Sequence, residues 1–192
     1  MIGITGHRST ITQALLAMLP DGEVPVWDEV PNDCGRYFFC AGVLHGKRVS
    51  QLPATESHET WDVNFAWVAE ECDRIIDGNP NARICVMGSE SGFAGSYDMA
   101  YAGAKAALHL YVETKRLRYP GQQLVAIAPT IIEDSAMTQR RGDLDACLAR
   151  GRQRRMGRWL RAENVARMVH HALYVDDGSL CNVVIRMNGG VS

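Results

Sequence analysis

Apolar residues along the chain fall into two alternating patterns, short continuous runs and longer stretches with helical spacing. Short runs bounded by turn residues are typical of buried parallel strands. These runs are residues 1–5, 23–28, 37–42, 84–87, 123–128 and 181–187. Helical spacing of apolar residues predicts amphipathic helices at residues 10–19, 58–77, 100–118 and 162–175. This alternation predicts an α/β fold, a doubly wound parallel sheet in three Rossmann-like α/β/α layers.

The organisation of the chain is simple. Residues 43–57 are polar, contain Gly46 and Pro53, and predict a loop. No internal repeat, linker or low-complexity tract interrupts the sequence. A length of 192 residues suits one domain with a sizeable core, so we expect a single domain over residues 1–192.

The stretch 82–105 carries the strongest chemical pattern. A short apolar run is followed by the turn cluster 88–92, which contains Ser89, and Tyr101 comes twelve residues after that serine. Tyr101 and Lys105 are four residues apart, so on a helix they share one face. Open α/β folds keep their ligand crevice at the carboxyl edge of the sheet. We therefore expect a hydroxyl, a phenol and an ammonium to meet there.

These three groups suit proton transfer. A free tyrosine has a pKa of about 10, and a nearby ammonium lowers that pKa because it favours the phenolate. Tyr101 would then be a usable acid or base nearer neutral pH. The Ser89 hydroxyl can hold a carbonyl or alkoxide oxygen in place.

The strand, the Gly-Ser-x-x-Gly turn and the Tyr-x-x-x-Lys pair together resemble the short-chain dehydrogenase/reductase family, with a spacing one residue shorter than in many members. The resemblance implies hydride transfer between a nicotinamide cofactor, NAD or NADP, and a carbonyl or alcohol substrate. In it Tyr101 is the general acid or base, Ser89 holds the substrate oxygen, and Lys105 lowers the pKa of the tyrosine and binds the nicotinamide ribose. Tyr101 and Lys105 thus also line the cofactor site.

A second motif of that family lies at the amino-terminal turn. A strand, a glycine turn and a helix open a dinucleotide-binding unit, in which helix amides bind the pyrophosphate. The family's turn reads Thr-Gly-x-x-x-Gly-x-Gly. Thr5 and Gly6 match it, whereas Thr10 and Thr12 replace the second and third glycines, although their hydroxyls could donate to phosphate oxygens. The cofactor-binding residues expected here are Gly6, His7, Arg8, Ser9, Thr10 and Ile11.

The choice between NAD and NADP stays open, with a slight preference for NAD. Asp28 lies 22 residues after Gly6, where an acid accepts from the adenosine ribose hydroxyls and favours NAD. Glu29 is an equal rival for that position. Arg8 argues for NADP, because a basic residue in this turn can meet a 2′-phosphate.

The chain then departs from the family. Only residues 31–35 separate the second strand from the next apolar run, so the family's third strand and its two flanking helices are expected to be missing. That run ends in Cys40, Ala41 and Gly42, which resemble the end of the family's Asn-Asn-Ala-Gly motif with a cysteine for the second asparagine. We therefore expect a thinner adenine pocket and a sheet edge that needs cover.

Further family positions follow in order along the chain. Asn64 aligns with the fourth catalytic residue, which holds a water linking the lysine to solvent. Pro129 and Thr130 stand where the family has Pro-Gly, so a further glycine is lost, and Ile132 occupies the place that meets the nicotinamide carboxamide. Asn188-Gly189-Gly190 resembles the Asp-Gly-Gly ending.

The histidines and a second phenol are given lesser roles. His109 falls on a helix that forms the dimer interface in the family, and is expected at an interface or the surface. Adjacent His170 and His171 point to different faces and are expected to be structural. Tyr97 is a rival phenol without a lysine four residues on.

Charge changes the picture at one segment. Residues 139–161 hold eight arginines and two acidic residues, whereas the whole chain has a formal net charge of −2. The resemblance implies a substrate lid at residues 131–161. The basic residues are either a solvated helix face or a means of attracting an anionic substrate.

Composition excludes several classes. The near-neutral charge argues against nucleic acid or membrane partners, and no signal peptide or membrane-length apolar run is evident. Six cysteines without a Cys-x-x-Cys pair indicate reduced thiols and no metal site. We expect a cytoplasmic protein, and the family resemblance implies a homodimer or homotetramer.

Two other functions are weighed. The changed glycine positions favour a degenerate Rossmann-type nucleotide-binding or regulatory protein without efficient turnover, whereas the intact Ser89, Tyr101 and Lys105 set argues against it. A nucleotide-sugar epimerase or dehydratase of the related extended family is disfavoured, because those chains carry a further substrate domain after the last strand.

Overall fold

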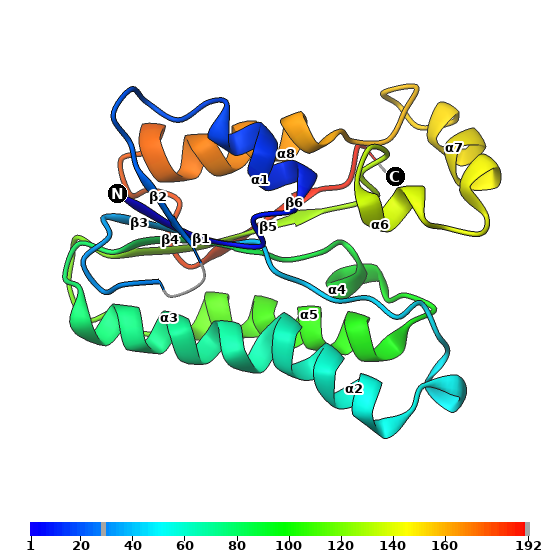
Figure 1. Cartoon of the computed structure of the whole chain (residues 1–192), viewed down its shortest axis with the longest axis horizontal. Coiled ribbons are helices and arrows are strands. Elements are labelled where there is room, and N and C mark those ends of the chain that lie inside the picture. Colours follow the sequence, from blue (N-terminus) through cyan, green and yellow to red (C-terminus); the bar gives the residue numbers. More distant parts are fainter. Residues whose placement is uncertain (28–29, 191–192) are drawn as a thin grey trace.

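The computed structural model describes residues 1–27 and 30–190, which form one six-stranded sheet with helices on both faces (Figure 1). The strand order is β2-β1-β3-β4-β5-β6, and every neighbouring pair is parallel. The strands are β1 (Ile2–Thr5), β2 (Pro25–Trp27), β3 (Arg36–Phe39), β4 (Arg83–Met87), β5 (Gln123–Pro129) and β6 (Val183–Met187). The predicted α/β fold and doubly wound parallel sheet are confirmed.

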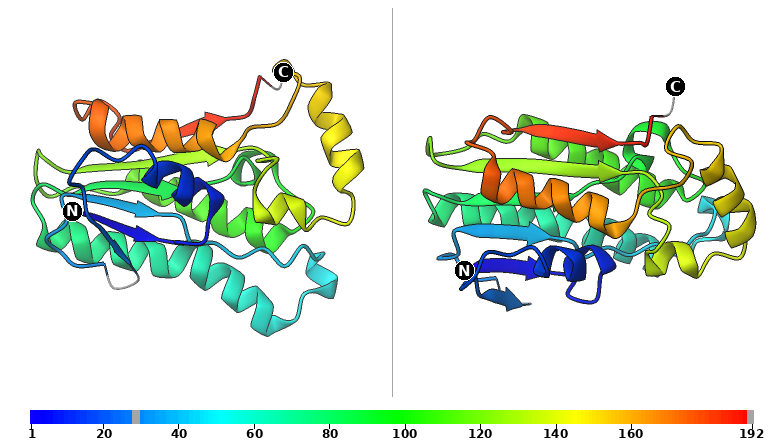
Figure 2. Two further views of the ribbon diagram at one scale, coloured as in Figure 1. Left: turned by 45° about the horizontal axis from the view of Figure 1, so that its top comes forward. Right: turned by 90° about the horizontal axis from the view of Figure 1, so that it is seen from above.

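Helices cover the sheet in two layers. The helices are α1 (Thr10–Leu16), α2 (Ala54–Trp61), α3 (Trp67–Gly78), α4 (Ser91–Ala94), α5 (Met99–Thr114), α6 (Ala136–Gln139), α7 (Leu144–Arg152) and α8 (Ala162–His170). Helices α1 and α8 lie on one face, and α3 and α5 lie on the other (Figure 1). Figure 2 shows that α6 and α7 lie beyond the carboxyl ends of the strands, the edge at which α/β folds bind ligands.

Each face of the sheet has its own hydrophobic core. Alternate residues of a strand point to opposite faces, so Phe38 joins the cluster under α1 and α8 while Phe39 joins the cluster over α3 and α5. The central strands are buried on both faces, and all seven residues of β5 are buried. This explains why β4 and β5 are continuous apolar runs without polar alternation.

The second predicted helix is longer than expected and is not uniform. Helical structure begins at Ala54 inside the predicted loop, and a short turn η1 (Val49–Gln51) precedes it. A π-helical turn, η2 (Asp62–Ala66), joins α2 to α3. The prediction of a loop over residues 43–57 is therefore wrong at its end, where residues 54–57 are helical. Glu56 lies in the first turn of α2, where the helix dipole favours an acidic residue.

Other boundaries shift by a few residues. Helix α1 ends at Leu16, and α5 ends at Thr114 in place of the expected residue 118. Helix α8 continues through a π turn, η3 (His171–Val175), so the helix predicted over residues 162–175 is confirmed. In it His170 stacks on Tyr174 with ring centres 4.9 Å apart, which is a structural role.

The sheet edge at β2 reflects the missing family segment. Strand β2 has three residues, all half-buried, and pairs with β1 alone among the described strands. A short edge strand offers few free backbone groups to another chain. Asp28 and Glu29, the two candidates for binding the adenosine ribose, lie outside the described residues.

Two expectations from composition can be compared with the structure. All six cysteines are free thiols, as predicted. Among the helices in the described ranges, none is long and apolar enough to cross a bilayer.

Candidate functional site

Strand β4 and helix α5 bring the serine, tyrosine and lysine to one edge of the sheet. Ser89 follows β4 by two residues, and Tyr101 and Lys105 lie one turn apart in α5. Asp98 caps α5 because its Oδ1 accepts from the Tyr101 amide at 3.1 Å, while its Oδ2 accepts from the Gly46 amide at 3.0 Å. Asp98 is fully buried, and it fixes where the helix begins and therefore which way Tyr101 faces.

Lys105 is a buried cation at the base of this site. Its side chain is 3% exposed, and Nζ donates to the Met87 carbonyl at 2.7 Å, at the last residue of β4. Nζ also lies 5.8 Å from the centre of the Tyr101 ring. Loss of solvation lowers the pKa of Lys105 to about 8, and the Cys40 thiol acts against that shift. The ammonium is thus held against both the strand end and the phenol.

Tyr101 behaves differently from the expectation. Burial raises the pKa of Tyr101 above its ordinary value, Asp98 and Cys40 add to that shift, and the Ser89 side chain acts against it. The expected lowering of this pKa by Lys105 is wrong for this arrangement, because the cost of burying a phenolate outweighs nearby positive charge. The Tyr101 phenol is therefore protonated at neutral pH.

His109 belongs to this site, although the sequence analysis assigned it to an interface or the surface. It is 4% exposed, and its Nε2 accepts from the Ser89 amide at 3.3 Å. Burial and the positive charge of Lys105 lower the pKa of His109 to about 4, so the imidazole is neutral. One signal was present in the sequence, since Tyr101, Lys105 and His109 recur every four residues on one helix face.

Aromatic and charged groups cover the outer side of His109. Phe93 stacks against its ring with centres 4.5 Å apart. The Arg186 guanidinium lies 4.4 Å from the centre of the Phe93 ring, and it forms an ion pair with Glu90. These contacts close residues 88–90, called the Ser89 loop below, over the imidazole.

Asn64 lies in the π-helical turn and is fully buried. Its Nδ2 donates to the carbonyls of Val43 and Thr60, at 2.8 Å each, so it connects the segment after β3 to the continuous helix formed by α2, η2 and α3. Its Oδ1 is buried without a hydrogen-bond partner among the described residues. A buried carbonyl oxygen of this kind is a position where an ordered water is expected. No hydrogen bond within the described ranges joins Asn64 to Lys105.

The turn between β1 and α1 is compact. Gly6 has a φ of +72°, and a Cβ there would lie 2.8 Å from the Ala41 nitrogen, so only glycine fits. Ser9 caps α1 by accepting from the Ile11 amide at 3.2 Å. The hydroxyl of fully buried Thr12 donates to the Gly6 carbonyl at 3.0 Å.

The two threonines that replace glycines therefore differ. The hydroxyl of Thr12 is used within the turn and cannot serve a phosphate, contrary to one expectation. The hydroxyl of Thr10 is buried and has no partner among the described residues. An unpaired buried donor of this kind fits a phosphate oxygen as its acceptor.

Cys40 connects the turn to the site of Tyr101 and Lys105. Its amide and that of Ala41 donate to the Thr5 hydroxyl at 3.2 Å each, and its thiol donates to the Ser9 hydroxyl at 3.3 Å. Burial raises the pKa of the Cys40 thiol, and Lys105 acts against that shift. The end of β3 thus lies between the glycine turn and Lys105. A Cβ on Gly42, the next residue but one, would lie 3.1 Å from Asn64 Oδ1.

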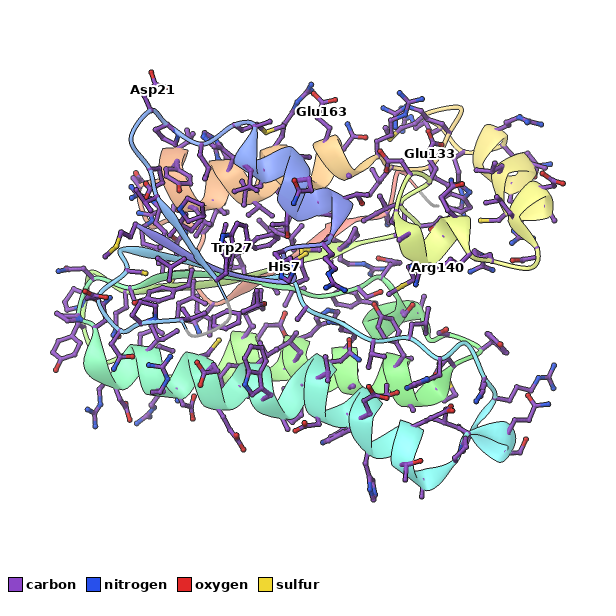
Figure 3. The ribbon with its side chains drawn as sticks, viewed as in Figure 1. His7, Asp21, Trp27, Glu133, Arg140 and Glu163 are labelled. Carbon is purple, nitrogen blue, oxygen red and sulfur yellow. The ribbon has the colours of Figure 1, made fainter. Side chains whose placement is uncertain are left out.

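The remaining predicted cofactor residues lie at the same edge or beyond it. His7 and Arg8 are exposed, and the His7 ring meets Trp27 edge-on at 6.0 Å (Figure 3). Pro129 ends β5, and the Thr130 amide donates to the Met187 carbonyl at 2.9 Å. Ile132 is buried and bridges to Leu160.

Residues 131–161, which include the basic segment, form α6, α7 and the loops around them. Glu133 and Arg161 pair at 2.9 Å across it, near the label of Glu133 in Figure 3. A cavity of about 570 Å³ opens here. Its lining residues are Glu133, Asp134, Gln139, Leu148, Arg152, Gly157, Arg158 and Arg161. Acidic and basic groups are mixed in this lining. No cluster suited to a metal ion is found in residues 1–27 and 30–190.

Comparison with solved structures identifies the class of fold. An oxidoreductase of the short-chain dehydrogenase/reductase family from Burkholderia thailandensis superposes with a TM-score of 0.84 at 16% identity, over 98% of this chain and 91% of that chain. A short-chain dehydrogenase/reductase from Brucella melitensis matches with a TM-score of 0.80 at 16% identity, over 100% of this chain and 96% of its own. The protein therefore has a short-chain dehydrogenase/reductase fold, in a shortened chain.

A third similar structure contains a cofactor. BdcA in complex with NADPH matches with a TM-score of 0.77 at 17% identity, over 98% of this chain and 92% of that chain. No protein-family model matches the sequence, and no curated protein does. The likeness is thus one of fold, carried by structure and not by sequence.

Proposed function

We propose that the protein is an NAD(P)-dependent oxidoreductase of the short-chain type, which transfers hydride between a nicotinamide cofactor and a carbonyl or alcohol substrate. The observation that carries the proposal is the meeting of Ser89, Tyr101 and buried Lys105 at the carboxyl edge of the sheet. A buried ammonium is costly, and such groups concentrate at functional sites. A structural role for Lys105 alone leaves the neighbouring phenol and hydroxyl unexplained.

In reduction, Tyr101 gives its phenolic proton to the carbonyl oxygen as the carbonyl carbon receives hydride. The raised pKa of Tyr101 keeps that proton in place at neutral pH. The Ser89 hydroxyl holds the same oxygen, and Lys105 stabilises the phenolate that remains. In oxidation the steps reverse, and the phenolate accepts the proton of the alcohol. A nicotinamide bound at this edge supplies the hydride chemistry.

The cofactor would lie along the carboxyl edge, between the β1–α1 turn and α5. The unpaired Thr10 hydroxyl suits a phosphate oxygen, and Gly6 permits close approach of the backbone. Lys105 would bind the nicotinamide ribose, and Asn64 would order a water through its unpaired oxygen. The other residues proposed to contact the cofactor are His7, Arg8, Ser9, Ile11, Asp28, Cys40, Ala41, Gly42, Pro129, Thr130 and Ile132.

The proposed nucleotide is either NAD or NADP. BdcA, whose fold is similar, is a complex with NADPH. Exposed Arg8 would favour the 2′-phosphate, whereas Asp28 would favour NAD. The segment 131–161 is proposed as a substrate lid, and its arginines would favour an anionic substrate. A cytoplasmic homodimer or homotetramer completes the proposal.

One observation favours a second function, that of a nucleotide-binding protein without efficient turnover. Thr12 occupies a fully buried position in the turn and uses its hydroxyl within the protein. The family's third glycine permits close packing of helix against strand, so a side chain there can shift the helix N-terminus whose amides would bind the pyrophosphate.

Calorimetric titration with NADH and NADPH distinguishes the two functions. Micromolar binding, followed by turnover of a carbonyl panel, is expected for the enzyme. Tyr101→Phe should then lower kcat by about 100-fold or more, because it removes the proton donor. Tyr97→Phe is the matched control, since Tyr97 is 61% exposed and has no lysine partner. No binding at millimolar cofactor contradicts the enzyme, and binding without any turnover favours the second function.

A further inference from the structure

We propose that His109 is a positioning residue, which fixes Ser89 for the reaction by accepting a hydrogen bond from the Ser89 backbone amide. This inference rests on the proposed function, in which Ser89 holds the reacting oxygen. His109 itself does not touch the substrate. It acts through the loop that carries Ser89.

The hydrogen bond defines the protonation of the ring. Nε2 accepts from the Ser89 amide at 3.3 Å, so in the neutral imidazole the proton must reside on Nδ1. Nδ1 is buried without a partner among the described residues. The chain thus leaves one buried polar atom unpaired in order to present an acceptor to Ser89. A leucine at this position would fill the space without that cost, so packing alone does not explain a histidine.

Two glycines, Gly88 and Gly92, leave space for the His109 ring. A Cβ on Gly88 would lie 2.5 Å from His109 Nε2, and a Cβ on Gly92 would lie 2.6 Å from Cε1. Neither glycine is among the positive-φ residues, so the backbone does not require glycine at either position. The close approach of the imidazole leaves no room for a side chain at either glycine, and a Cβ on Gly92 would also lie 3.0 Å from the Ala106 nitrogen. Both glycines therefore allow the imidazole to reach the backbone around Ser89.

The position of His109 on α5 explains how its contact with the Ser89 amide can help to align the site. Tyr101, Lys105 and His109 are four residues apart on the same helix, which is a rigid element. The helix that carries the proton donor thus also holds the amide of the residue that binds the oxygen. Because α5 holds both the Tyr101 phenol and, through His109, the Ser89 backbone, a flexible loop does not set the distance between the Ser89 and Tyr101 side chains.

Neutrality of the imidazole is consistent with this arrangement. The charged groups that act on His109 are Lys105 in α5, Glu90 in the Ser89 loop and Arg186 in β6. The two cations disfavour a third positive charge beside them, and Glu90 is paired with Arg186. The acceptor nitrogen is therefore available from about pH 4, the pKa of His109, upward, which includes neutral pH.

Nuclear magnetic resonance tests the contact without any turnover. Long-range ¹H–¹⁵N spectra of the labelled full chain assign the tautomer of His109, and Nε2 should be unprotonated. Hydrogen exchange of the Ser89 amide should be slow in the wild type and in His109→Gln, whose amide oxygen can accept in the same place. Exchange should become at least about tenfold faster in His109→Leu. A proton on Nε2, or equal protection in all three proteins, overturns the proposal.

Kinetics tests the positioning. His109→Leu should lower kcat by about tenfold or more with little change in cofactor KM, because the lost interaction acts at the reacting oxygen. His109→Gln should restore most of that loss. In a double-mutant cycle with Ser89→Ala, His109→Leu should add little, since its effect passes through Ser89. Additive losses, or a loss that His109→Gln shares equally, overturn the proposal.

A control separates positioning from stability. Leu108→Ala removes a buried side chain of the core between the sheet and α3 and α5. It should lower Tm at least as much as His109→Leu does, but leave kcat near the wild-type value. If the wild type binds no cofactor, the proposed function fails while the tautomer and exchange results still decide the contact.

Discussion

At the scale of single residues, the buried ammonium of Lys105 couples stability to pH. Its pKa is about 8 in the folded protein, against an ordinary value of 10.5. Below the lower value both states hold the proton, and the cost of the buried charge is fully present. Between the two values the unfolded chain holds a proton that the native protein has released. The free energy of unfolding therefore rises with pH in this window.

Comparison with Lys105→Met isolates this effect, since other titrating groups are common to both proteins. Between about pH 7 and about pH 9.5, the wild type should gain roughly 2 kcal/mol of unfolding free energy relative to the variant. Urea unfolding at the two pH values measures the difference. A constant difference would mean that Lys105 keeps an ordinary pKa and is not desolvated.

The two threonines of the β1–α1 turn should respond in opposite ways to loss of the hydroxyl. Thr12→Val leaves the Gly6 carbonyl without its partner and should lower the free energy of unfolding by about 1–2 kcal/mol. Thr10→Val removes an unpaired buried hydroxyl, so it should leave stability unchanged or higher.

Cofactor affinity then tests whether the Thr10 hydroxyl binds a phosphate. If its hydroxyl donates to a phosphate, Thr10→Val should weaken binding by about tenfold, as expected for a hydrogen bond to a charged group. Calorimetry and thermal unfolding on the same samples give both quantities. Unchanged affinity in Thr10→Val would show that the phosphate lies elsewhere.

At the scale of elements, the fit between the Ser89 loop and α5 can be tested through Gly88. A Cβ there meets the His109 ring at 2.5 Å, so Gly88→Ala should lower the free energy of unfolding by roughly 1–3 kcal/mol through overpacking. The same substitution in a His109→Ala background should cost much less, because the ring is gone. Gly35→Ala is the control, since nothing lies within 4 Å of its Cβ. Equal losses in both backgrounds would locate the strain in the backbone.

The elements that could be predicted are those whose signal is local. Continuous apolar runs identified β4 and β5, and the Tyr101–Lys105 spacing placed both residues on α5. The π-helical turn at Asn64 could not be predicted, because its hydrogen bonds reach Val43 in a distant segment. The spacing on α5 put His109 on the face of Tyr101 and Lys105, but its burial also depends on two glycines near Ser89, outside α5, so the helix pattern alone did not establish it.

The site was predictable in composition and less so in electrostatics. Residue types and spacing identified Ser89, Tyr101 and Lys105 as neighbours. The direction of the Tyr101 pKa shift could not be obtained from them, since it depends on how deeply the phenol is buried. The division of labour between Thr10 and Thr12 likewise depends on which hydroxyl reaches the Gly6 carbonyl.

At the scale of the whole molecule, the shortened chain keeps the edge of the sheet on which the site depends. The site lies between β1, β3, β4 and α5, near the middle of the strand order, whereas the missing segment would extend the sheet beyond β2. Loss of an edge strand therefore leaves Ser89, Tyr101 and Lys105 in place. It affects the region beside Trp27, where the adenine end of a nucleotide would lie.

The outer face formed by α2 and α5 is where self-association is expected. Leu110 is 63% exposed and Trp61 is 46% exposed, and the Trp61 ring lies 3.9 Å from a Cβ placed on Gly103, two turns before Leu110. Large apolar side chains gathered beside small residues on one helical face are typical of an interface. We expect a homodimer through this face, with these side chains buried between the two copies.

Leu110→Glu should convert that dimer to a monomer, because a desolvated carboxylate would face its own copy across the two-fold axis. Sedimentation velocity measures the change, and Val175→Glu is the matched control, since Val175 is 61% exposed but follows α8 on the other layer. A wild-type monomer would rule out the interface, and dissociation by both variants would place it elsewhere. Because α5 also carries Tyr101, Lys105 and His109, a loss of kcat in the Leu110→Glu monomer would show that the second copy helps to hold this helix in its active position.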